Sequence, residues 1–198
     1  MFTGIVQEVG KVRSITHKGD HWVVAVSSSV IVNKAAVSES ICCNGVCLTL
    51  VRKASGMMYF DIMKQTLDTT AWNRAKPGDP VNMEPALSMS GKLDGHFVLG
   101  HVDAPAEIVS LKKDSSGIAI EVAIDKKFVS YAVEKGSITL DGISLTIADV
   151  TNHSLTVKII PYTWEHTSLK SKKAGSIINV EFDYLAKIVL NHNAIIGK

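Results

Sequence analysis

The stretch Asn44-Gly-Val-Cys-Leu-Thr-Leu50 (NGVCLTL) returns almost unchanged as DGISLTI at 141–147, which is 97 positions further along the chain. The same shift places KPGDPVNME at 76–84 on KAGSIINVE at 173–181, and a shift of 96 places GIVQ at 4–7 on GHVD at 100–103. Chance similarity would not hold this register over most of a half-chain. The sequence therefore predicts an internal duplication of a module of about 95 residues, the size of a small domain.

Each module has the features of a β structure. Asn44-Gly45 and Asp141-Gly142 are dipeptides that favour two-residue hairpin turns, because both central positions of such a turn need a positive φ. The stretches HWVVAVSSSVIV at 21–32 and SGIAIEVAI at 116–124 are rich in β-branched residues with partial alternation. Short strands separated by turns predict an all-β fold, as a closed barrel or a sandwich, in each half.

The tail DYLAKIVLNHN at 183–193 follows a different pattern. Leu185, Ile188 and Val189 recur at helical spacing, and the first module ends without a counterpart. The sequence predicts a C-terminal helix with an apolar face. Docking of this face on its own barrel and joining of subunits are equally compatible with the pattern.

Composition argues against several classes of protein. The formal net charge is only +2 and the chain is 46% hydrophobic, so neither nucleic acid binding nor disorder is indicated. The three cysteines, Cys42, Cys43 and Cys47, are odd in number and clustered, which favours neither a disulfide framework nor a metal site. The first residues lack the pattern of a signal peptide and no apolar run reaches membrane-spanning length. A cytoplasmic protein is expected.

Differences between the two modules mark the candidate chemistry. Cys47 corresponds to Ser144, so a thiol and a hydroxyl occupy equivalent positions after a turn. The second module also gains three groups able to move protons or hold a polar ligand, namely His101, Lys135 and Asp141. Structural roles are equally available, because Asp before Gly suits turns and a strand Cys is usually a small buried apolar group.

Six segments together resemble the riboflavin synthase, or lumazine-binding, family over nearly the whole chain, in the order and spacing of that family. They are MFTGIVQ at 1–7, NGVCLTL at 44–50, FDIMKQTL at 60–67, GHFVLGHVD at 95–103, EKGSITLDGISLTI at 134–147 and IPYTWEHTSL at 160–169.

The resemblance implies two Greek-key β-barrels, at 1–93 and 94–184, and a helical tail at 185–198 that assembles a homotrimer. It implies a transferase that moves a four-carbon unit between two molecules of 6,7-dimethyl-8-ribityllumazine. The products are riboflavin and 5-amino-6-(D-ribitylamino)uracil. The resemblance implies that no metal or nicotinamide cofactor is used. It places each active site between the N-terminal barrel of one subunit and the C-terminal barrel of its neighbour. It also implies association with lumazine synthase.

The resemblance also implies site residues. The first pocket would use Gly4, Ile5, Val6, Cys47, Leu48, Thr49, Asp61, Ile62, Met63, Lys64, Gln65 and Thr66. The second would use Gly100, His101, Val102, Lys135, Ser144, Leu145, Thr146, Ile160, Pro161, Tyr162, Thr163, Trp164 and Glu165. Chemistry is expected from Cys47, Ser144, His101 and Asp141, supported by Phe2, Ser40, His96, Lys135 and Thr146.

Two details depart from or extend the family pattern. Gln65 stands where many members of the family carry a glutamate, so no charge is expected there. Tyr162 and Trp164 would either stack on a ring or pack in the core.

Two other functions remain compatible with the sequence. One is a non-catalytic lumazine or flavin carrier of the same fold, which the retained polar residues disfavour. The other is a pair of β-barrels without small-molecule chemistry.

Overall fold

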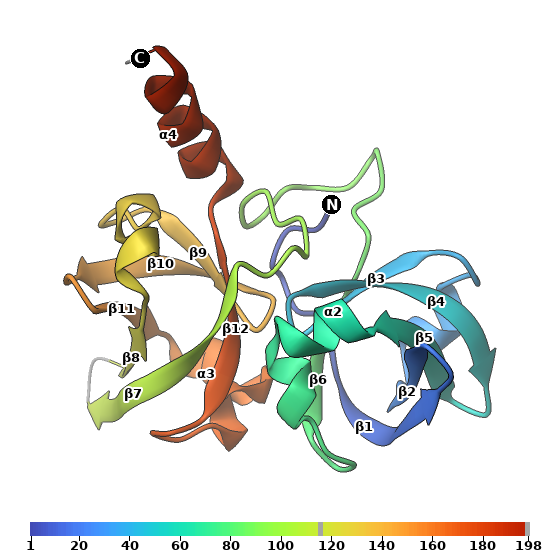
Figure 1. The fold of residues 1–198 in the computed structure, drawn as a ribbon. Coiled ribbons are helices and arrows are strands. Elements are labelled where there is room, and N and C mark those ends of the chain that lie inside the picture. The colour runs from blue at the N-terminus through green and yellow to red at the C-terminus, as the bar shows by residue number, and fades with distance from the viewer. Residues whose placement is uncertain (115–116, 197–198) are drawn as a thin grey trace.

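The computed structural model describes residues 1–114 and 117–196. Two β-barrels lie side by side, and a helix at the C-terminal end extends away from them (Figure 1). In the described residues six antiparallel strands close each barrel, which confirms the predicted all-β, duplicated fold.

The first barrel has the strand order β1-β2-β5-β4-β3-β6, and β6 pairs with β1 to close it. Its elements are β1 (Glu8–Lys18), β2 (His21–Ser27), α1 (Ile31–Lys34), β3 (Ser40–Cys43), β4 (Val46–Ala54), β5 (Met57–Met63), α2 (Lys64–Asp68), η1 (Ala71–Arg74) and β6 (Pro80–Pro85).

The second barrel repeats this order as β10-β11-β8-β7-β12-β9, closed by the pairing of β9 with β10. Its elements are β7 (Ala104–Asp114), β8 (Gly117–Ala123), η2 (Lys126–Tyr131), β9 (Ser137–Leu140), β10 (Ile143–Val150), β11 (Ser154–Ile159), α3 (Pro161–Glu165), η3 (Ser168–Ser171) and β12 (Ile177–Phe182).

The repeated hairpin turns meet each other between the barrels. Asn44 and Asp141 have φ values of 47° and 45°, as the turn prediction requires, and the following glycines are also left-handed. A Cβ on Gly45 would lie 3.0 Å from the backbone nitrogen of Gly142. Only glycine allows the two hairpin tips to approach this closely.

Each barrel has its own apolar core. Phe60, Leu50 and Met58 are fully buried in the first, and Ile120, Val157 and Phe182 in the second. Burying one such side chain contributes about 1.5–3 kcal/mol, so each module has its own source of stability.

Two irregular segments connect the barrels. The N-terminal residues and the linker between β6 and β7 run antiparallel, with a bridge between Phe2 and Val98. The Phe2 N–H donates to the Val98 carbonyl at 2.7 Å, and the Val98 N–H donates to the Phe2 carbonyl at 3.2 Å. We call residues 2–6 the N-terminal strap and residues 94–102 the linker strap.

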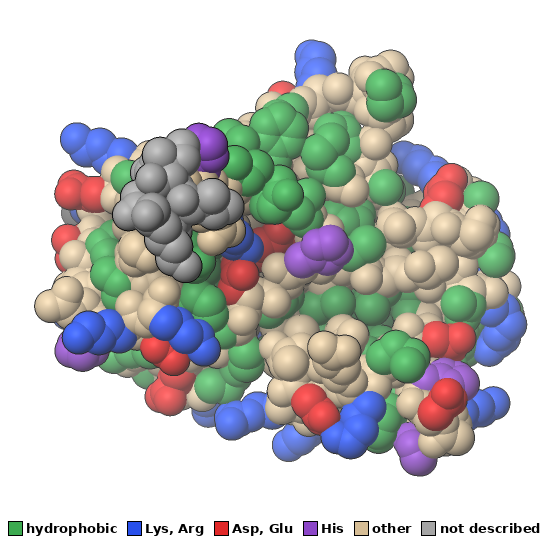
Figure 2. All heavy atoms as spheres, turned by 45° about the horizontal axis from the view of Figure 1, so that its top comes forward, with side chains coloured by type: hydrophobic (Ala, Val, Ile, Leu, Met, Phe, Trp, Pro, Cys, Tyr) green, Lys and Arg blue, Asp and Glu red, His purple; other side chains and the backbone are tan. Residues whose placement is uncertain are grey.

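The C-terminal helix α4 (Tyr184–Ile196) confirms the predicted helical tail. An ion pair between Lys187 and Asp103 joins it to the second barrel. Ile188 and Val189 are 46% and 57% exposed, and Tyr184 and Leu185 are exposed with them. Figure 2 shows apolar side chains gathered beside the grey C-terminal residues at this end of the molecule. No helix of the described residues is long and apolar enough to span a membrane.

Candidate functional site

Equivalent rows of side chains lie on the two barrels. In the first barrel Cys47 pairs with Cys42 across β4 and β3, and Cys42 pairs with Glu84 on β6. In the second barrel Ser144, Thr139 and Glu181 occupy the equivalent positions. Because directly opposite residues share one face of a sheet, each row presents its three side chains together. Both thiols of the first row are hydroxyls in the second.

The straps cross over these rows. The Cys47 N–H donates to the Gly100 carbonyl at 2.9 Å, and the Ser144 N–H donates to the Gly4 carbonyl at 2.8 Å. Gly4 and Gly100 have positive φ, and a Cβ on either would lie within 2.7 Å of the opposing Ser144 or Cys47 side chain. Glycine is therefore required at both crossings. Gly100 of the linker strap thus covers the first barrel and Gly4 of the N-terminal strap covers the second, while the start of the linker strap, at Asp94 and Gly95, also lines the Ser144 pocket.

Buried glutamates hold the straps in place. Glu84 accepts hydrogen bonds from the Thr3 N–H and hydroxyl, both at 2.7 Å, and from the Gly4 N–H at 2.9 Å. Glu181 accepts from the Leu99 N–H at 2.8 Å and the Gly100 N–H at 3.0 Å. Burial raises the pKa of both carboxyl groups, while these hydrogen bonds favour their ionised form.

The structure corrects the predicted composition of the two pockets. The linker strap, Gly100 to Val102, lies beside Cys47, and the N-terminal strap lies beside Ser144. The sequence prediction had these partners exchanged. The repeat alignment correctly matches the two straps, but it carries no information about which barrel each strap crosses to.

The first-barrel pocket is a cavity of about 230 Å³ with Cys47 and His101 in its wall. Cys47 is half-buried, whereas Cys42 and Cys43 are buried and burial raises the pKa of both thiols. The lining residues are Val46, Cys47, Gln65, Thr66, Thr69, Thr70, Gly100, His101 and Val102.

The second-barrel pocket is a cavity of about 350 Å³ that contains Ser144. Its lining residues are Ile5, Asp94, Gly95, Ser137, Ser144, Leu145, Thr146, Lys158, Ile159, Ile160 and Thr163. Lys158 is the repeat counterpart of Asp61, so the two modules place opposite charges at this position. Asp61 lies 3.8 Å from His21 Nε2 and is not part of the first-barrel lining.

The remaining predicted binding residues have varied positions. Leu48 and Ile62 belong to the first core, Val6 and Trp164 pack against the second core, and Tyr162 stacks on His166 with ring centroids 4.0 Å apart. Trp164 thus takes the packing role. Residues Ser40, Thr49, Met63, Lys64, Pro161 and Glu165 line neither pocket.

Phe2 and Lys135 are not among the residues that line the two pockets. Phe2 is 0% exposed and packs with Cys42 and Val98 in a small cluster that Cys47 borders. Lys135 lies in a turn with φ of 65°, and its N–H donates to the Ile147 carbonyl. Of these two predicted catalytic residues, Phe2 is thus a buried part of the N-terminal strap and Lys135 lies in a turn.

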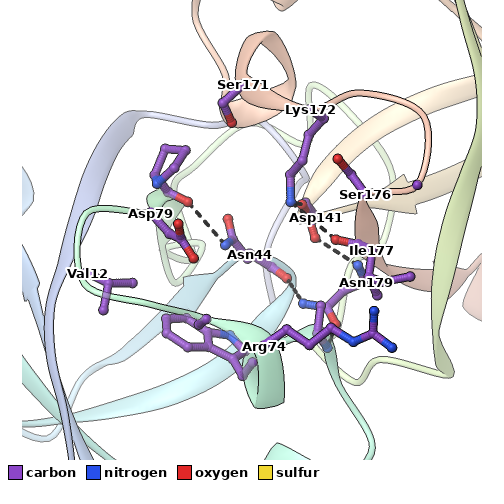
Figure 3. A pocket seen from close by; sticks show the side chains of 15 residues that line it. Val12, Asn44, Arg74, Asp79, Asp141, Ser171, Lys172, Ser176, Ile177 and Asn179 are labelled. Carbon is purple, nitrogen blue, oxygen red and sulfur yellow. Dashed lines mark hydrogen bonds and ion pairs between the residues drawn. The ribbon is translucent and has the colours of Figure 1, made fainter.

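Asp141 is also absent from the Ser144 pocket. Its carboxylate is 1% exposed, accepts a hydrogen bond from the Asn179 N–H at 2.8 Å, and lies 2.8 Å from Lys172 Nζ. Figure 3 shows this pair in a separate cavity of about 300 Å³ between the barrels, opposite Asn44. Asn179 and Lys172 of the same barrel hold the Asp141 carboxylate away from Ser144.

His96, predicted only as a supporting residue, is the side chain that contacts Ser144. Its Nδ1 lies 2.7 Å from Ser144 Oγ, and its Nε2 lies 3.1 Å from Thr139 Oγ1. Burial lowers the pKa of His96, although the charge of Asp183 raises it, so the neutral ring is favoured. Sequence reasoning missed Thr139, although its alignment with Cys42 repeats the thiol-to-hydroxyl change at Ser144.

Fold and pockets together define a class of protein: a duplicated double barrel with two related small-molecule pockets, one bordered by a thiol and one by a hydroxyl. The chain belongs to the lumazine binding domain family, whose model matches residues 3–86 and 99–183.

Similar proteins of known name are enzymes. The riboflavin synthase of Actinobacillus pleuropneumoniae is 39% identical over 96% of this chain and 88% of its own length. That of Bacillus subtilis is 36% identical over 94% and 87%, and that of Mycobacterium tuberculosis is 37% identical over 96% of both. The chain is accordingly an enzyme of the transferase type.

Solved structures share the fold. The crystal structure of LumP complexed with riboflavin has a TM-score of 0.84 at 25% identity, over 92% of this chain and 99% of LumP. The LumP complex with 6,7-dimethyl-8-(1'-D-ribityl) lumazine has a TM-score of 0.83 at 22% identity, with the same coverage.

Proposed function

We propose that the protein has riboflavin synthase activity. Two molecules of 6,7-dimethyl-8-ribityllumazine would exchange a four-carbon unit, giving riboflavin and 5-amino-6-(D-ribitylamino)uracil. The observation that carries this proposal is the pair of equivalent but unlike pockets, one with Cys47 and His101 and one with Ser144 and His96.

The duplication suits a reaction between two copies of one molecule. Both pockets must recognise the same ring, yet one copy donates the four-carbon unit and the other accepts it. Similar walls give the shared recognition, and the thiol-to-hydroxyl difference supports unequal roles. Holding two rings in contact would replace a rare bimolecular encounter and supply much of the rate enhancement.

We further propose that the complete site forms between subunits of a homotrimer, with the first-barrel pocket of one subunit facing the second-barrel pocket of the next. The exposed apolar face of α4, formed by Tyr184, Leu185, Ile188 and Val189, supports helix-mediated assembly. The domains proposed are 1–93, 94–184 and the assembling tail 185–198. Cytoplasmic location and association with lumazine synthase are parts of the same proposal, and fractionation and co-purification test them.

A lumazine or flavin carrier is the second candidate, and the ligand-bound LumP structures favour it. The polar groups retained in this chain, Cys47, His101 and Ser144, favour the enzyme, because a carrier needs no proton transfer. His101 supplies an imidazole to the first-barrel pocket and is our choice for a proton-transfer group.

Purified protein mixed with 6,7-dimethyl-8-ribityllumazine alone tests the proposal. The expected result is a change of absorbance and fluorescence from lumazine to flavin without added metal or nucleotide. Tight binding without conversion would establish the carrier instead. Absence of binding would overturn both functions.

A further inference from the structure

Thr139 belongs to the hydroxyl row of the second barrel and has no assigned role in the proposed site. It lies on β9 directly opposite Ser144 on β10 and is 1% exposed. Within the described chain, its hydroxyl has one hydrogen-bond partner, Nε2 of His96 at 3.1 Å. Since the other ring nitrogen of His96 lies 2.7 Å from Ser144 Oγ, the three side chains form a continuous hydrogen-bond chain.

A neutral imidazole ring carries one N–H proton, on either Nδ1 or Nε2, so the hydrogen bonds of this row can point in only two directions. If Nε2 carries the proton, it donates to Thr139, and the Thr139 hydroxyl hydrogen is left buried without an acceptor in the chain. If Nδ1 carries the proton, Thr139 donates to Nε2 and Nδ1 donates to Ser144. In that case both buried donors are satisfied.

The cost of an unsatisfied donor decides between the two directions. A buried hydroxyl without an acceptor costs about 1–3 kcal/mol, and only the arrangement with the proton on Nε2 carries this cost. The Ser144 hydroxyl carries no such cost in the second arrangement, because it borders an open pocket in which water or a bound ligand can accept its hydrogen.

We infer that Thr139 is a positioning residue: it donates to His96 Nε2, fixes the proton on Nδ1, and thereby makes Ser144 a hydrogen-bond donor into the second-barrel pocket. The ligand group that Ser144 meets is then an acceptor, such as a ring carbonyl or a ring carrying negative charge. The role of this donor in turnover rests on the proposed function.

The first barrel has no equivalent chain. Cys42 takes the place of Thr139 and packs with Phe2 and Val98, where no ring nitrogen is available. The oriented donor is therefore specific to the second-barrel pocket and adds to the difference between the two pockets.

Nitrogen-15 NMR of histidine side chains in the full-length protein tests the direction of the chain, without turnover. We assign the His96 signals by their loss in His96→Gln and record them above the ordinary histidine pKa of about 6.5. The expected spectrum has the proton on Nδ1. A proton on Nε2, or an equal mixture of tautomers, would overturn the inference.

Variants of Thr139 supply the second measurement. Thr139→Val should release the fixed tautomer and lower kcat about tenfold, the effect of one lost oriented hydrogen bond, with little change in KM. Thr139→Ser keeps the hydroxyl and should keep both the fixed tautomer and the wild-type kcat. Thr156→Val should also leave the tautomer and kcat unchanged, because Thr156 is a strand residue of the same barrel that lines neither pocket. An unchanged tautomer in Thr139→Val contradicts the inference. Wild-type protein that fails to convert lumazine refutes the proposed function but leaves the NMR result valid.

Discussion

The Ser144 N–H donates a hydrogen bond to the Gly4 carbonyl at 2.8 Å, although Gly4 precedes the first barrel in the chain and Ser144 belongs to the second. The matching bond joins Cys47 of the first barrel to Gly100 of the linker strap. Each pocket is therefore built by one barrel and by a strap that the other barrel's glutamate holds. These contacts tie the two modules into one structural unit.

Gly100→Ala should disrupt the first-barrel pocket. The new Cβ would lie 2.7 Å from Cys47 Cβ, and φ of +76° adds backbone strain. We expect a loss of more than about 1 kcal/mol in the free energy of unfolding and weaker ligand binding. Gly19→Ala, with φ of +62° and no atom within 4 Å of the new Cβ, measures the strain alone. Thermal unfolding that is equal in the two variants would rule out the close contact as the cause.

Cys47→Ser and Ser144→Cys should have unequal effects on turnover. Ser144→Cys weakens the 2.7 Å contact with His96, because a thiol is a poor hydrogen-bond partner, whereas Cys47 borders an apolar cluster. We expect the larger fall in kcat, of about tenfold, for Ser144→Cys. Single-turnover kinetics with each variant gives the comparison. Equal losses with unchanged binding would argue against different roles for the two pockets.

Ending the chain at Asp183 should weaken assembly and turnover together. The deletion removes the exposed apolar face of α4 and leaves β12, which ends at Phe182, intact. Ile188→Asp should also weaken assembly and turnover, because it places one charge on the apolar face of α4. Asn191→Asp adds the same charge at an exposed polar position of this helix and should weaken neither. Sedimentation and steady-state rates are measured on the same samples. A fully active monomer would exclude a site shared between subunits.

His96 should make stability depend on pH in the weakly acidic range. Burial holds its pKa below the ordinary value of 6.5, so the unfolded chain binds a proton that the folded site resists. The contribution of His96 to the free energy of unfolding is therefore fully present above pH 6.5. It is lost as the pH falls from 6.5 through the pKa of His96 in the folded protein. Chemical unfolding across this range should show that the free energy of unfolding falls as the pH falls. This pH dependence should disappear in His96→Gln and remain in His153→Gln, a substitution at an exposed position. A slope unchanged in His96→Gln would assign it to other groups.

The fold was predictable from the sequence because the evidence is local. Asn44-Gly45 and Asp141-Gly142 specify turns through their own backbone preferences. Because the sequence repeats, a strand and turn assignment made in one half applies to the other half as well. The site was only partly predictable, because Asp141 and Phe2 take their positions from contacts with residues that are distant in sequence, Lys172 for Asp141 and Val98 for Phe2. His96 lies outside the segments that the repeat aligns, so comparing the modules gave it no weight.

The crossed straps predict that a mutation in one barrel damages the pocket of the other. Glu181→Ala removes the acceptor for the Leu99 and Gly100 N–H groups, and each buried donor left unsatisfied costs about 1–3 kcal/mol. The strap over Cys47 should then open, and alkylation of this thiol should become faster. Cys42 and Cys43 are buried, so the reaction reports on Cys47.

Glu84→Ala is the matched control, since it releases the strap that covers Ser144 and leaves Gly100 in place. It should leave the Cys47 alkylation rate close to that of the wild type while weakening ligand binding in the second-barrel pocket. If both variants accelerate alkylation equally, the cause is general loosening of the barrels. A selective effect of Glu181→Ala would show that the second barrel controls the first-barrel pocket through the linker strap.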